Sequence, residues 1–388
     1  MKQKHIVMLS RTLPFHSMGG MQAIAWDLAC QFAADGLKIT VITTHIPNMP
    51  EHFFQNGVEV VAIKDATPER YTRSWWRLSR KYFEQHLMDS VTGVLSVSAA
   101  AYGLLQLKHR MVGTPFVFQA HGTSWGEINS KWKSRSPKAI ITSVRNMLWL
   151  IKDIWAYSKF DAVVAVGDAV KSDLLKKPVS YVLPYRKIHL ISNGINTKLF
   201  APDDNSRYEM RTALGWTNDE QVIVSASRLH IQKGLHLGLN AFAKISQKNP
   251  KARYMIIGDG PERKNLERQV SELNISDKVL FTGEVERQNL PPYLRAGDLF
   301  LFTTTRSEGL PLNVLEALSV GLPAVVSEHL QGVIKINSLI RGVDPGSERE
   351  IVEEIDKMFK TSRGINTLPK EYSLSFCAKR YYALLSIS

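Results

Sequence analysis

The chain has 388 residues, of which 44% are hydrophobic and 22% are charged. This is an ordinary globular composition; it predicts two or three domains and excludes a disordered or collagen-like chain. The two cysteines, Cys30 and Cys377, are too few for a disulfide framework and lack metal-ligand spacing, which indicates a reducing compartment. The apolar run before Ser10 and Arg11 is too short for the core of a signal peptide, so we expect a cytoplasmic protein.

The formal net charge of +13 is unevenly distributed along the chain. Residues 1–192 hold 24 Lys and Arg against 13 Asp and Glu, whereas residues 193–388 hold 25 against 23. The first half therefore carries +11 and the second half +2. A basic half predicts an anionic partner, which can be nucleic acid, an anionic membrane surface or a negatively charged acceptor.

Apolar runs of strand length alternate with segments of helix length through the first half. The first repeat is a strand over 5–9, a Gly-Gly pair at 19–20 and a helix over 21–34. The later strand-like runs span 37–43, 58–63, 91–97, 115–119, 162–166 and 188–191. This alternation predicts a parallel sheet with helices on both faces.

A polar, turn-rich stretch over 193–205 interrupts the alternation and is typical of a domain boundary. Beyond it, helices are predicted around 235–248, 261–273 and 311–320. They alternate with strand-like runs over 222–225, 253–257, 279–281, 299–302 and 324–326. The fold class predicted is therefore α/β, with two Rossmann-like domains.

Two stretches of the first half combine aromatic and basic residues. In the first, apolar residues recur at helical spacing among arginines: Tyr71, Trp75, Leu78 and Tyr82. The second runs from Lys131 to Tyr157 and contains Trp132, Trp149 and Trp155 among basic residues; its internal charges argue against a transmembrane helix. Each stretch is either an interfacial amphipathic helix or an ordinary helix that packs its apolar stripe on the sheet.

The densest group of functional residue types lies in the segment 303–318, directly after a strand-like run. Pro311 favours the first turn of a helix, which places Glu308 in the preceding loop and Glu316 inside the helix. The N–H groups of residues 312–314 are then available at a helix N-terminus, where the dipole favours a phosphate. Carboxylates on either side can accept hydrogen bonds from sugar hydroxyls. The segment suits a nucleoside-diphosphate sugar, and the alternative is a capped surface helix with incidental glutamates.

Two further clusters follow strand-like runs. Arg228 and Lys233 lie at the carboxyl end of a strand, where ligands bind in open α/β sheets, and two cations there can neutralise a diphosphate. A solvated loop is the alternative. Gly258 opens a Gly-Asp-Gly-Pro turn that permits close backbone approach but lacks the full spacing of a dinucleotide fingerprint, which disfavours an NAD site.

Together these clusters resemble the retaining glycosyltransferases of the GT-B class, specifically family four with its Glu-x7-Glu motif. The resemblance rests on Gly19-Gly20, His121-Gly122, Asn193 to Asn196 with Phe200, Arg228, Lys233-Gly234, Gly258 to Pro261, Phe281 to Gly283, and Glu308 through Glu316 to Pro323. It implies two Rossmann-like domains that face each other across a cleft, with the last helix crossing back to the first domain. We place the domains at 1–195 and 196–371 and the returning helix at 372–388.

The resemblance also implies a role for each matched residue. Arg228 and Lys233 hold the diphosphate and stabilise the charge of the departing nucleotide, so that no metal or other cofactor is required. Glu316 accepts hydrogen bonds from the ribose hydroxyls, and Glu308 does so from the transferred sugar. His121 is expected near the donor sugar.

The other expected contacts to the nucleotide sugar come mainly from loops. They involve Gly19, Gly20, Gly258, Val285 near the base, Gly309, Leu310, Pro311, Leu312 and Asn313. After Ser327 the chain departs from the family's usual Gly-Gly-x-x-Glu loop.

We therefore expect a retaining, metal-independent enzyme that transfers an α-linked sugar from a UDP- or GDP-sugar to an acceptor hydroxyl. The basic first half favours a glycan or glycolipid acceptor, lipid-linked or of the lipopolysaccharide, O-antigen or capsule type, reached from the cytoplasmic face of an anionic membrane. Nucleic acid is not expected, because no nucleic-acid-binding module is recognisable. The alternatives are a GT-B sugar-nucleotide epimerase and a catalytically silent protein that only binds a sugar nucleotide.

Overall fold

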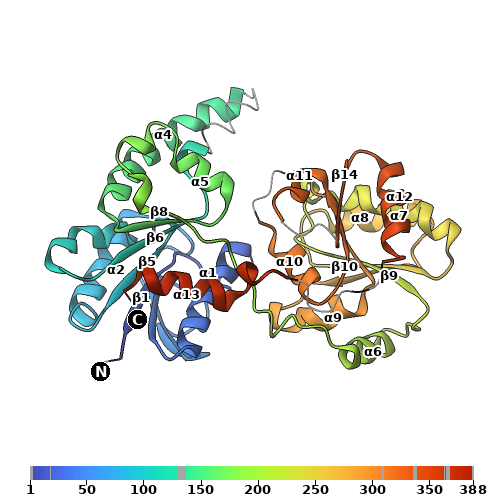
Figure 1. The fold of residues 1–388 in the computed structure, drawn as a ribbon, viewed down its shortest axis with the longest axis horizontal. Helices are drawn as coiled ribbons and strands as arrows, with labels where there is room; N and C mark the ends of the chain where they lie inside the picture. Colours follow the sequence, from blue (N-terminus) through green and yellow to red (C-terminus); the bar gives the residue numbers. More distant parts are fainter. Residues whose placement is uncertain are drawn as a thin grey trace. The chain divides into compact units, whose positions relative to one another are not determined.

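The computed structural model describes residues 3–17, 19–126, 128, 137–306, 310–334, 339–361, 363 and 368–386. The chain divides into two compact units, Met1–Gly194 with Leu374–Ser388, and Ile195–Ser373. Each unit contains one sheet with helices on both faces (Figure 1). The predicted fold class, an α/β protein with two Rossmann-like domains, is confirmed.

The first unit, within the described residues, contains an eight-stranded sheet in the order β3-β4-β2-β1-β5-β6-β7-β8. Its strands are β1 (His5–Leu9), β2 (Lys38–Thr44), β3 (His52–Gln55), β4 (Val58–Ile63), β5 (Gly93–Val97), β6 (Phe116–Ala120), β7 (Ala162–Ala165) and β8 (Ile188–Leu190). The neighbouring strands of this described sheet are parallel apart from β3 and β4, which pair antiparallel at one edge. β1, β5 and β6 are buried along their whole length, as parallel strands covered on both faces must be.

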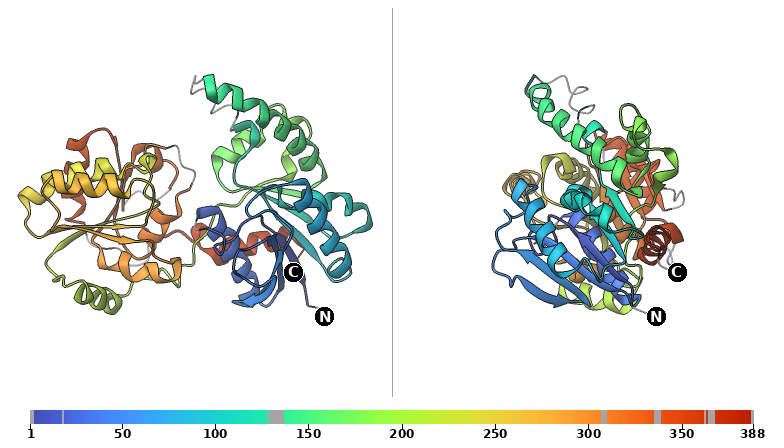
Figure 2. Two further views of the ribbon diagram at one scale, coloured as in Figure 1. Left: turned by 180° about the vertical axis from the view of Figure 1, so that it is seen from behind. Right: turned by 90° about the vertical axis from the view of Figure 1, so that its left-hand side faces the viewer.

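Helices cover both faces of the first sheet. α1 (Gly20–Ala34) and α13 (Leu374–Leu384) pack side by side on one face (Figures 1 and 2). The other face is covered by α2 (Arg73–His86), the 3-10 segment η1 (Ser98–Gln106), α4 (Pro137–Lys159) and α5 (Asp168–Leu174). Shorter 3-10 segments are η2 (Lys108–Arg110), η3 (Val179–Tyr181) and η4 (Tyr185–Lys187).

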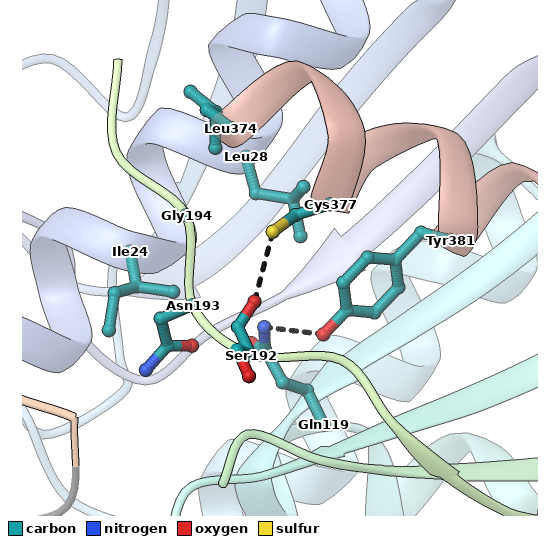
Figure 3. A pocket seen from close by; sticks show the side chains of 9 residues that line it. All are labelled: Ile24, Leu28, Gln119, Ser192, Asn193, Gly194, Leu374, Cys377 and Tyr381. Atoms are coloured by element: carbon teal, nitrogen blue, oxygen red, sulfur yellow. Dashed lines mark hydrogen bonds between the residues drawn. The ribbon is translucent and has the colours of Figure 1, made fainter. Parts of the chain in front are cut away.

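The last helix, α13, is tied to the first sheet by two hydrogen bonds (Figure 3). The Nε2 group of Gln119 donates to the hydroxyl of Tyr381 at 2.8 Å. The Sγ atom of Cys377 lies 3.0 Å from the carbonyl oxygen of Ser192. Burial raises the pKa of the Cys377 thiol to about 12, so the thiol stays protonated and acts as the donor. The helix begins at Leu374 rather than at residue 372.

The stretch over 71–82 packs into the core. Its helix, α2, buries Trp75 completely, and the indole Nε1 of Trp75 donates to the carbonyl oxygen of Ala100 at 3.1 Å. The Tyr71 hydroxyl donates to the carbonyl oxygen of Val97 at 3.1 Å. Of the two interpretations of this stretch, the structure therefore supports the ordinary packed helix.

The second unit contains, among its described residues, a six-stranded parallel sheet in the order β11-β10-β9-β12-β13-β14. Its strands are β9 (Gln221–Ala226), β10 (Ala252–Ile257), β11 (Val279–Gly283), β12 (Leu299–Phe302), β13 (Ala324–Ser327) and β14 (Ile340–Val343). One face is covered by α9 (Leu290–Ala296), α10 (Leu312–Ser319) and α11 (Glu328–Gln331), and the other by α7 (Leu235–Lys248), α8 (Arg263–Glu272) and α12 (Glu348–Met358). This unit begins one residue earlier than the predicted domain, at 195.

A partly buried ion cluster joins α6 (Asp204–Ala213) to the second sheet. The carboxylate of Asp298 lies 2.6 Å from Nη2 of Arg207 and 2.6 Å from Nη2 of Arg211. The same carboxylate accepts a hydrogen bond from the main-chain N–H of Val222 on β9 at 2.8 Å. Only 1% of the Arg211 side chain is exposed, so its charge depends on this partner.

We predict that Asp298→Asn destabilises the second unit, because it leaves the buried Arg211 charge without its counterion. The expected loss in the free energy of unfolding is about 3 kcal/mol, measured by urea denaturation followed by circular dichroism. The control is Asp219→Asn, which removes a carboxylate from an exposed pair with Lys251 and should leave stability unchanged. Equal effects of the two substitutions would contradict the assignment.

Candidate functional site

The candidate site lies at the carboxyl edge of the second sheet, the edge at which ligands bind in open α/β folds. The strands β11, β10, β9 and β12 are neighbours in this sheet, and the loops that follow them meet at this edge. These loops carry the predicted residues Val285 after β11, Gly258 after β10, Arg228 and Lys233 after β9, and Leu310 to Glu316 after β12. The structure therefore brings most of the predicted second-half residues together.

Main-chain contacts hold the loops after β9, β10 and β11 together. The N–H of Gly258 donates to the carbonyl oxygen of Gly283 at 2.8 Å, and the N–H of Leu229 donates to that of Asp259 at 2.8 Å. Gly258 has a φ of 127°, and a Cβ atom there would lie 2.2 Å from the carbonyl oxygen of Ser227. Only glycine fits, because both the backbone conformation and the contact exclude a side chain.

The loop after β9 also rests on the loop after β12. The 3-10 segment η5 (Ile231–Lys233) ends in Gly234, whose φ is 69°. A Cβ atom on Gly234 would lie 1.9 Å from the carbonyl oxygen of Thr303. The N–H of Thr305 donates to the carbonyl oxygen of Gln232 at 2.9 Å. The backbone that carries the two predicted cations is therefore fixed on two sides.

The two cationic residues of this loop are Arg228 and Lys233. The Arg228 side chain is exposed, whereas Lys233 is half-buried. The Nζ atom of Lys233 lies 5.4 Å from the ring centroid of Phe302, a cation–π contact that limits where the ammonium group can move. Two positive charges at the end of β9 can hold a bulky anion such as a diphosphate.

The helix α10 begins at the same edge of the sheet. It starts at Leu312, with Pro311 as its N-cap residue, one position later than predicted. The side-chain Nδ2 of Asn313 donates to the carbonyl oxygen of Ala226 at 2.8 Å, which ties the first turn of α10 to the end of β9. The partial positive charge of this helix N-terminus therefore adds to the charge at the same edge.

Glu316 projects from α10 and is paired with an arginine that the sequence analysis did not predict. The glutamate is 5% exposed. Arg287 opens the segment η6 (Arg287–Asn289) after β11, and its Nε and Nη2 atoms lie 2.8 and 2.7 Å from Oε1 of Glu316. Both contacts converge on one oxygen, so the arginine holds Oε1 of this buried carboxylate in place. Arg287 follows Val285 by two positions at a strand end, the same signal that identified Arg228.

Two predicted residues of the second half, Glu308 and Gly309, lie outside the described residues. The segment that departs from the family's usual loop forms the short helix α11. The Nε2 atom of His329 on this helix lies 2.9 Å from the carbonyl oxygen of Arg306. The unusual segment is therefore bonded to the loop that leads into Glu308.

Three predicted residues lie in the first unit. Gly19 and Gly20 precede and open α1, after β1, and His121 follows β6, so all three lie at the carboxyl edge of the first sheet. Gly19 is extended, and a Cβ atom on Gly20 would meet no heavy atom within 4 Å. The backbone therefore does not itself require glycine at position 20.

His121 is held as a neutral imidazole. Its Nε2 atom lies 3.0 Å from Oε1 of Gln119, and because an amide oxygen only accepts, Nε2 carries the proton. Gln119 is in turn bonded to Tyr381 of α13. Burial lowers the pKa of His121 to about 4, so the ring is uncharged at neutral pH.

The described part of the chain has no group of three or more His, Cys, Asp or Glu side chains placed to hold a metal ion. The described polar groups at this edge are the cations Arg228 and Lys233, main-chain groups, the ion-paired Glu316 and the exposed carboxylates of Asp259, Glu284 and Glu286. No helix in the described ranges is both long enough and apolar enough to cross a membrane.

Comparison with known proteins identifies the family. A family model described as "Glycosyl transferases group 1" matches residues 206–370, and one described as "Glycosyltransferase Family 4" matches residues 18–199. The chain therefore belongs to the GT-B glycosyltransferases of family four, as the sequence motifs predicted.

Individual relatives show how far the likeness extends. Alpha-D-kanosaminyltransferase of Streptomyces kanamyceticus is 24% identical over 68% of this chain and 65% of its own length. The UDP-Gal:alpha-D-GlcNAc-diphosphoundecaprenol alpha-1,3-galactosyltransferase of Escherichia coli is 30% identical over 64% of this chain and 58% of its own length. The chain thus spans less than two thirds of either relative. A solved structure of Anabaena HepE in complex with UDP covers 99% of this chain and 100% of its own, with a TM-score of 0.70 and 18% identity, which is a likeness of fold.

The neutral state of His121 makes the stability of the first unit pH-dependent. In the unfolded chain the ring has its ordinary pKa of 6.5, so the unfolded state binds more protons than the folded state between about pH 6.5 and pH 4. The free energy of unfolding is therefore expected to fall as the pH falls through this window. In His121→Gln this decrease should be smaller than in the wild type.

Tryptophan fluorescence during urea denaturation measures this effect, because seven of the eight tryptophans lie in residues 1–194. The wild type and His121→Gln would be compared at several pH values. An identical pH dependence of the two proteins would refute a neutral, half-buried His121.

Proposed function

We propose that this protein is a retaining, metal-independent glycosyltransferase that moves an α-linked sugar from a nucleotide sugar to an acceptor hydroxyl. The proposal is carried by one observation: Arg228, Lys233 and the first turn of α10 converge at one edge of the second sheet. Two cations and a helix N-terminus at one edge suit a diphosphate, whose negative charge grows as it leaves the sugar. UDP and GDP sugars are the proposed donors, and the fold likeness to HepE, solved with UDP, supports the first of these.

The proposed mechanism uses the groups of this chain without a resident metal. The bond between the anomeric carbon and the diphosphate oxygen breaks while Arg228 and Lys233 stabilise the departing charge. The acceptor hydroxyl attacks the same face, and its proton passes to the leaving phosphate, so the α configuration is kept. Glu308 and His121 are assigned to the transferred sugar, and Glu316 is assigned to the ribose hydroxyls.

The remaining donor contacts are assigned to loops. Their residues are Gly19, Gly20, Gly258, Val285, Gly309, Leu310, Pro311, Leu312 and Asn313. The rigid main-chain contacts of Gly258 support this assignment, because they hold the loop in place before a ligand binds.

The proposed acceptor is a lipid-linked or cell-surface glycan, as in lipopolysaccharide, O-antigen or capsule synthesis. The excess of positive charge in residues 1–192 supports an acceptor that carries negative charge. The Escherichia coli relative supports a lipid-linked acceptor, since its name specifies a diphosphoundecaprenol-linked sugar. We place the reaction at the cytoplasmic face of the inner membrane.

Arg287 is proposed as a positioning residue for Glu316. The two contacts from its guanidinium hold Oε1 of the carboxylate in place, and 16% of the arginine side chain is exposed. A carboxylate held in this way does not need to reorganise when ribose hydroxyls bind. The affinity for the ribose part of the donor is therefore expected to depend on Arg287.

We predict that one family of nucleotide sugars binds in the presence of EDTA and that Arg228→Ala weakens this binding at least tenfold. The physical reason is the loss of a charge-assisted contact to the diphosphate. Calorimetry with UDP-, GDP-, ADP-, CMP- and dTDP-sugars measures the effect. The control is Lys248→Ala, which removes an exposed cation at the C-terminal end of α7, just before β10, and should leave affinity unchanged.

Turnover of the donor that binds separates the proposal from its alternatives. NMR of the products with a lipid-linked acceptor is expected to show an α-linked sugar. An epimerised donor formed without acceptor would indicate an epimerase, and binding without turnover would indicate a silent sugar-nucleotide-binding protein. A β-linked product, or loss of transfer with EDTA, would also contradict the proposal.

We predict that Arg287→Ala lowers the affinity for the nucleoside diphosphate about tenfold, whereas Arg287→Lys lowers it less. The affinity for the 2′,3′-dideoxy analogue should be weak in the wild type and should not fall further in Arg287→Ala. This non-additivity is the signature of a residue that acts through the ribose contact. Equal losses for both nucleotides would instead indicate a general structural role.

A further inference from the structure

We propose that the outer face of α4 is a docking surface for an anionic lipid bilayer. The described exposed side of this helix carries four large apolar side chains. Met147 is 51% exposed, Leu148 is 63%, Ile151 is 66% and Trp155 is 46%. Isolated exposed apolar residues are common, but four on one helix face form a contiguous patch that marks an interaction site.

The orientation of α4 is fixed by polar groups on its inner side. Asp153 is buried, and its two carboxylate oxygens accept hydrogen bonds from the Tyr102 hydroxyl and the Ser124 hydroxyl, both at 2.7 Å. Asn146 is also buried on this helix. A rotation of the helix that hid the apolar patch would break the hydrogen bonds of Asp153, so the outward-facing apolar side is a fixed feature of the fold.

Exposed aromatic rings with lysines beside them also lie near the C-terminal end of α4. The Nζ atom of Lys187 in η4 donates to the carbonyl oxygens of Ser158 at 3.3 Å and Phe160 at 2.8 Å, which holds η4 against this end of the helix. In the same region Tyr185 is 66% exposed, with the Nζ atom of Lys171 lying 5.7 Å from its ring centroid.

A second ring of this kind lies in η3. Tyr181 is 71% exposed, and the Nζ atom of Lys177 lies 5.4 Å from its ring centroid. Tyr and Trp rings with lysines beside them are the side chains that settle at the boundary between acyl chains and headgroups.

The net charge of the region around the outer face of α4 distinguishes between its possible partners. Residues 146–187 contain seven Lys and Arg against four Asp and Glu, and one of the four is the buried Asp153. A second copy bound through the same face would bring like charges together, which opposes self-association. A negatively charged bilayer satisfies both the apolar patch and the surrounding cations. α4 would then lie in the plane of the interface with its apolar face in the headgroup boundary.

Vesicle sedimentation with the purified full chain tests the proposal. We expect binding to vesicles of phosphatidylcholine with phosphatidylglycerol at low salt and weak binding to phosphatidylcholine alone. The double variant Ile151→Ser with Trp155→Ser should lower the partition coefficient at least tenfold. The matched control is Phe54→Ser, which removes a 78% exposed aromatic ring on the edge strand β3 and should bind like the wild type. Thermal melts confirm that each variant is folded.

A second measurement locates the contact on α4. Trp155→Leu keeps an apolar side chain, so it should still bind vesicles, but it should lose part of the quenching of tryptophan fluorescence by brominated lipid. Three results would each overturn the proposal. They are full quenching in this variant, no sedimentation of the wild type at low salt, and equal binding by the double variant and the wild type. Self-association that the double variant abolishes, without vesicle binding, would overturn it in favour of a second copy. None of these outcomes depends on nucleotide-sugar binding, so the docking proposal and the proposed function can fail separately.

Discussion

The proposed donor site depends on close contact between main chains at the carboxyl edge of the second sheet. Gly258 lies against the loop after β9, and Gly234 lies against the loop after β12, at distances that leave no room for a Cβ atom. These contacts fix the segment that carries Arg228 and Lys233 before any ligand arrives. A diphosphate can then meet cations that are already in place, so that little binding energy is lost in ordering the loop.

The ion pair between Arg287 and Glu316 likewise holds a side chain in place before a ligand binds. A buried carboxylate without a partner is costly, and the arginine satisfies it while also setting its direction. The proposed docking face on α4 shows a related arrangement, because the buried Asp153 and its two hydrogen bonds determine which side of the helix meets solvent. In both units, buried polar groups orient the surface chemistry on which the proposals rest.

The sequence predicted the parallel strands well, because runs such as 5–9 and 222–225 are continuous and apolar and are bounded by turn residues. The edge strand β3 was missed, since His52–Gln55 has no buried apolar run and is defined only by its pairing with β4. The position of Arg287 after a strand could have been recognised, but its pairing with Glu316 could not, because the two residues are 29 positions apart and only the tertiary fold brings them together. The tryptophans among basic residues over 131–157 left two alternatives open, an interfacial amphipathic helix and an ordinary packed one, and did not show which side of α4 would face the core. Glu308, central to the motif, lies outside the described residues.

Hydrogen exchange with and without a nucleotide sugar shows whether the donor binds at the carboxyl edge of the second sheet. We expect the donor to slow amide exchange in the loops that follow β9, β10, β11 and β12, in particular over 226–234 and 310–316, and we expect Arg228→Ala to remove this protection. Protection confined to other parts of the chain, or unchanged protection in Arg228→Ala at a saturating concentration matched to the wild type, would contradict the placement of the donor site at this edge.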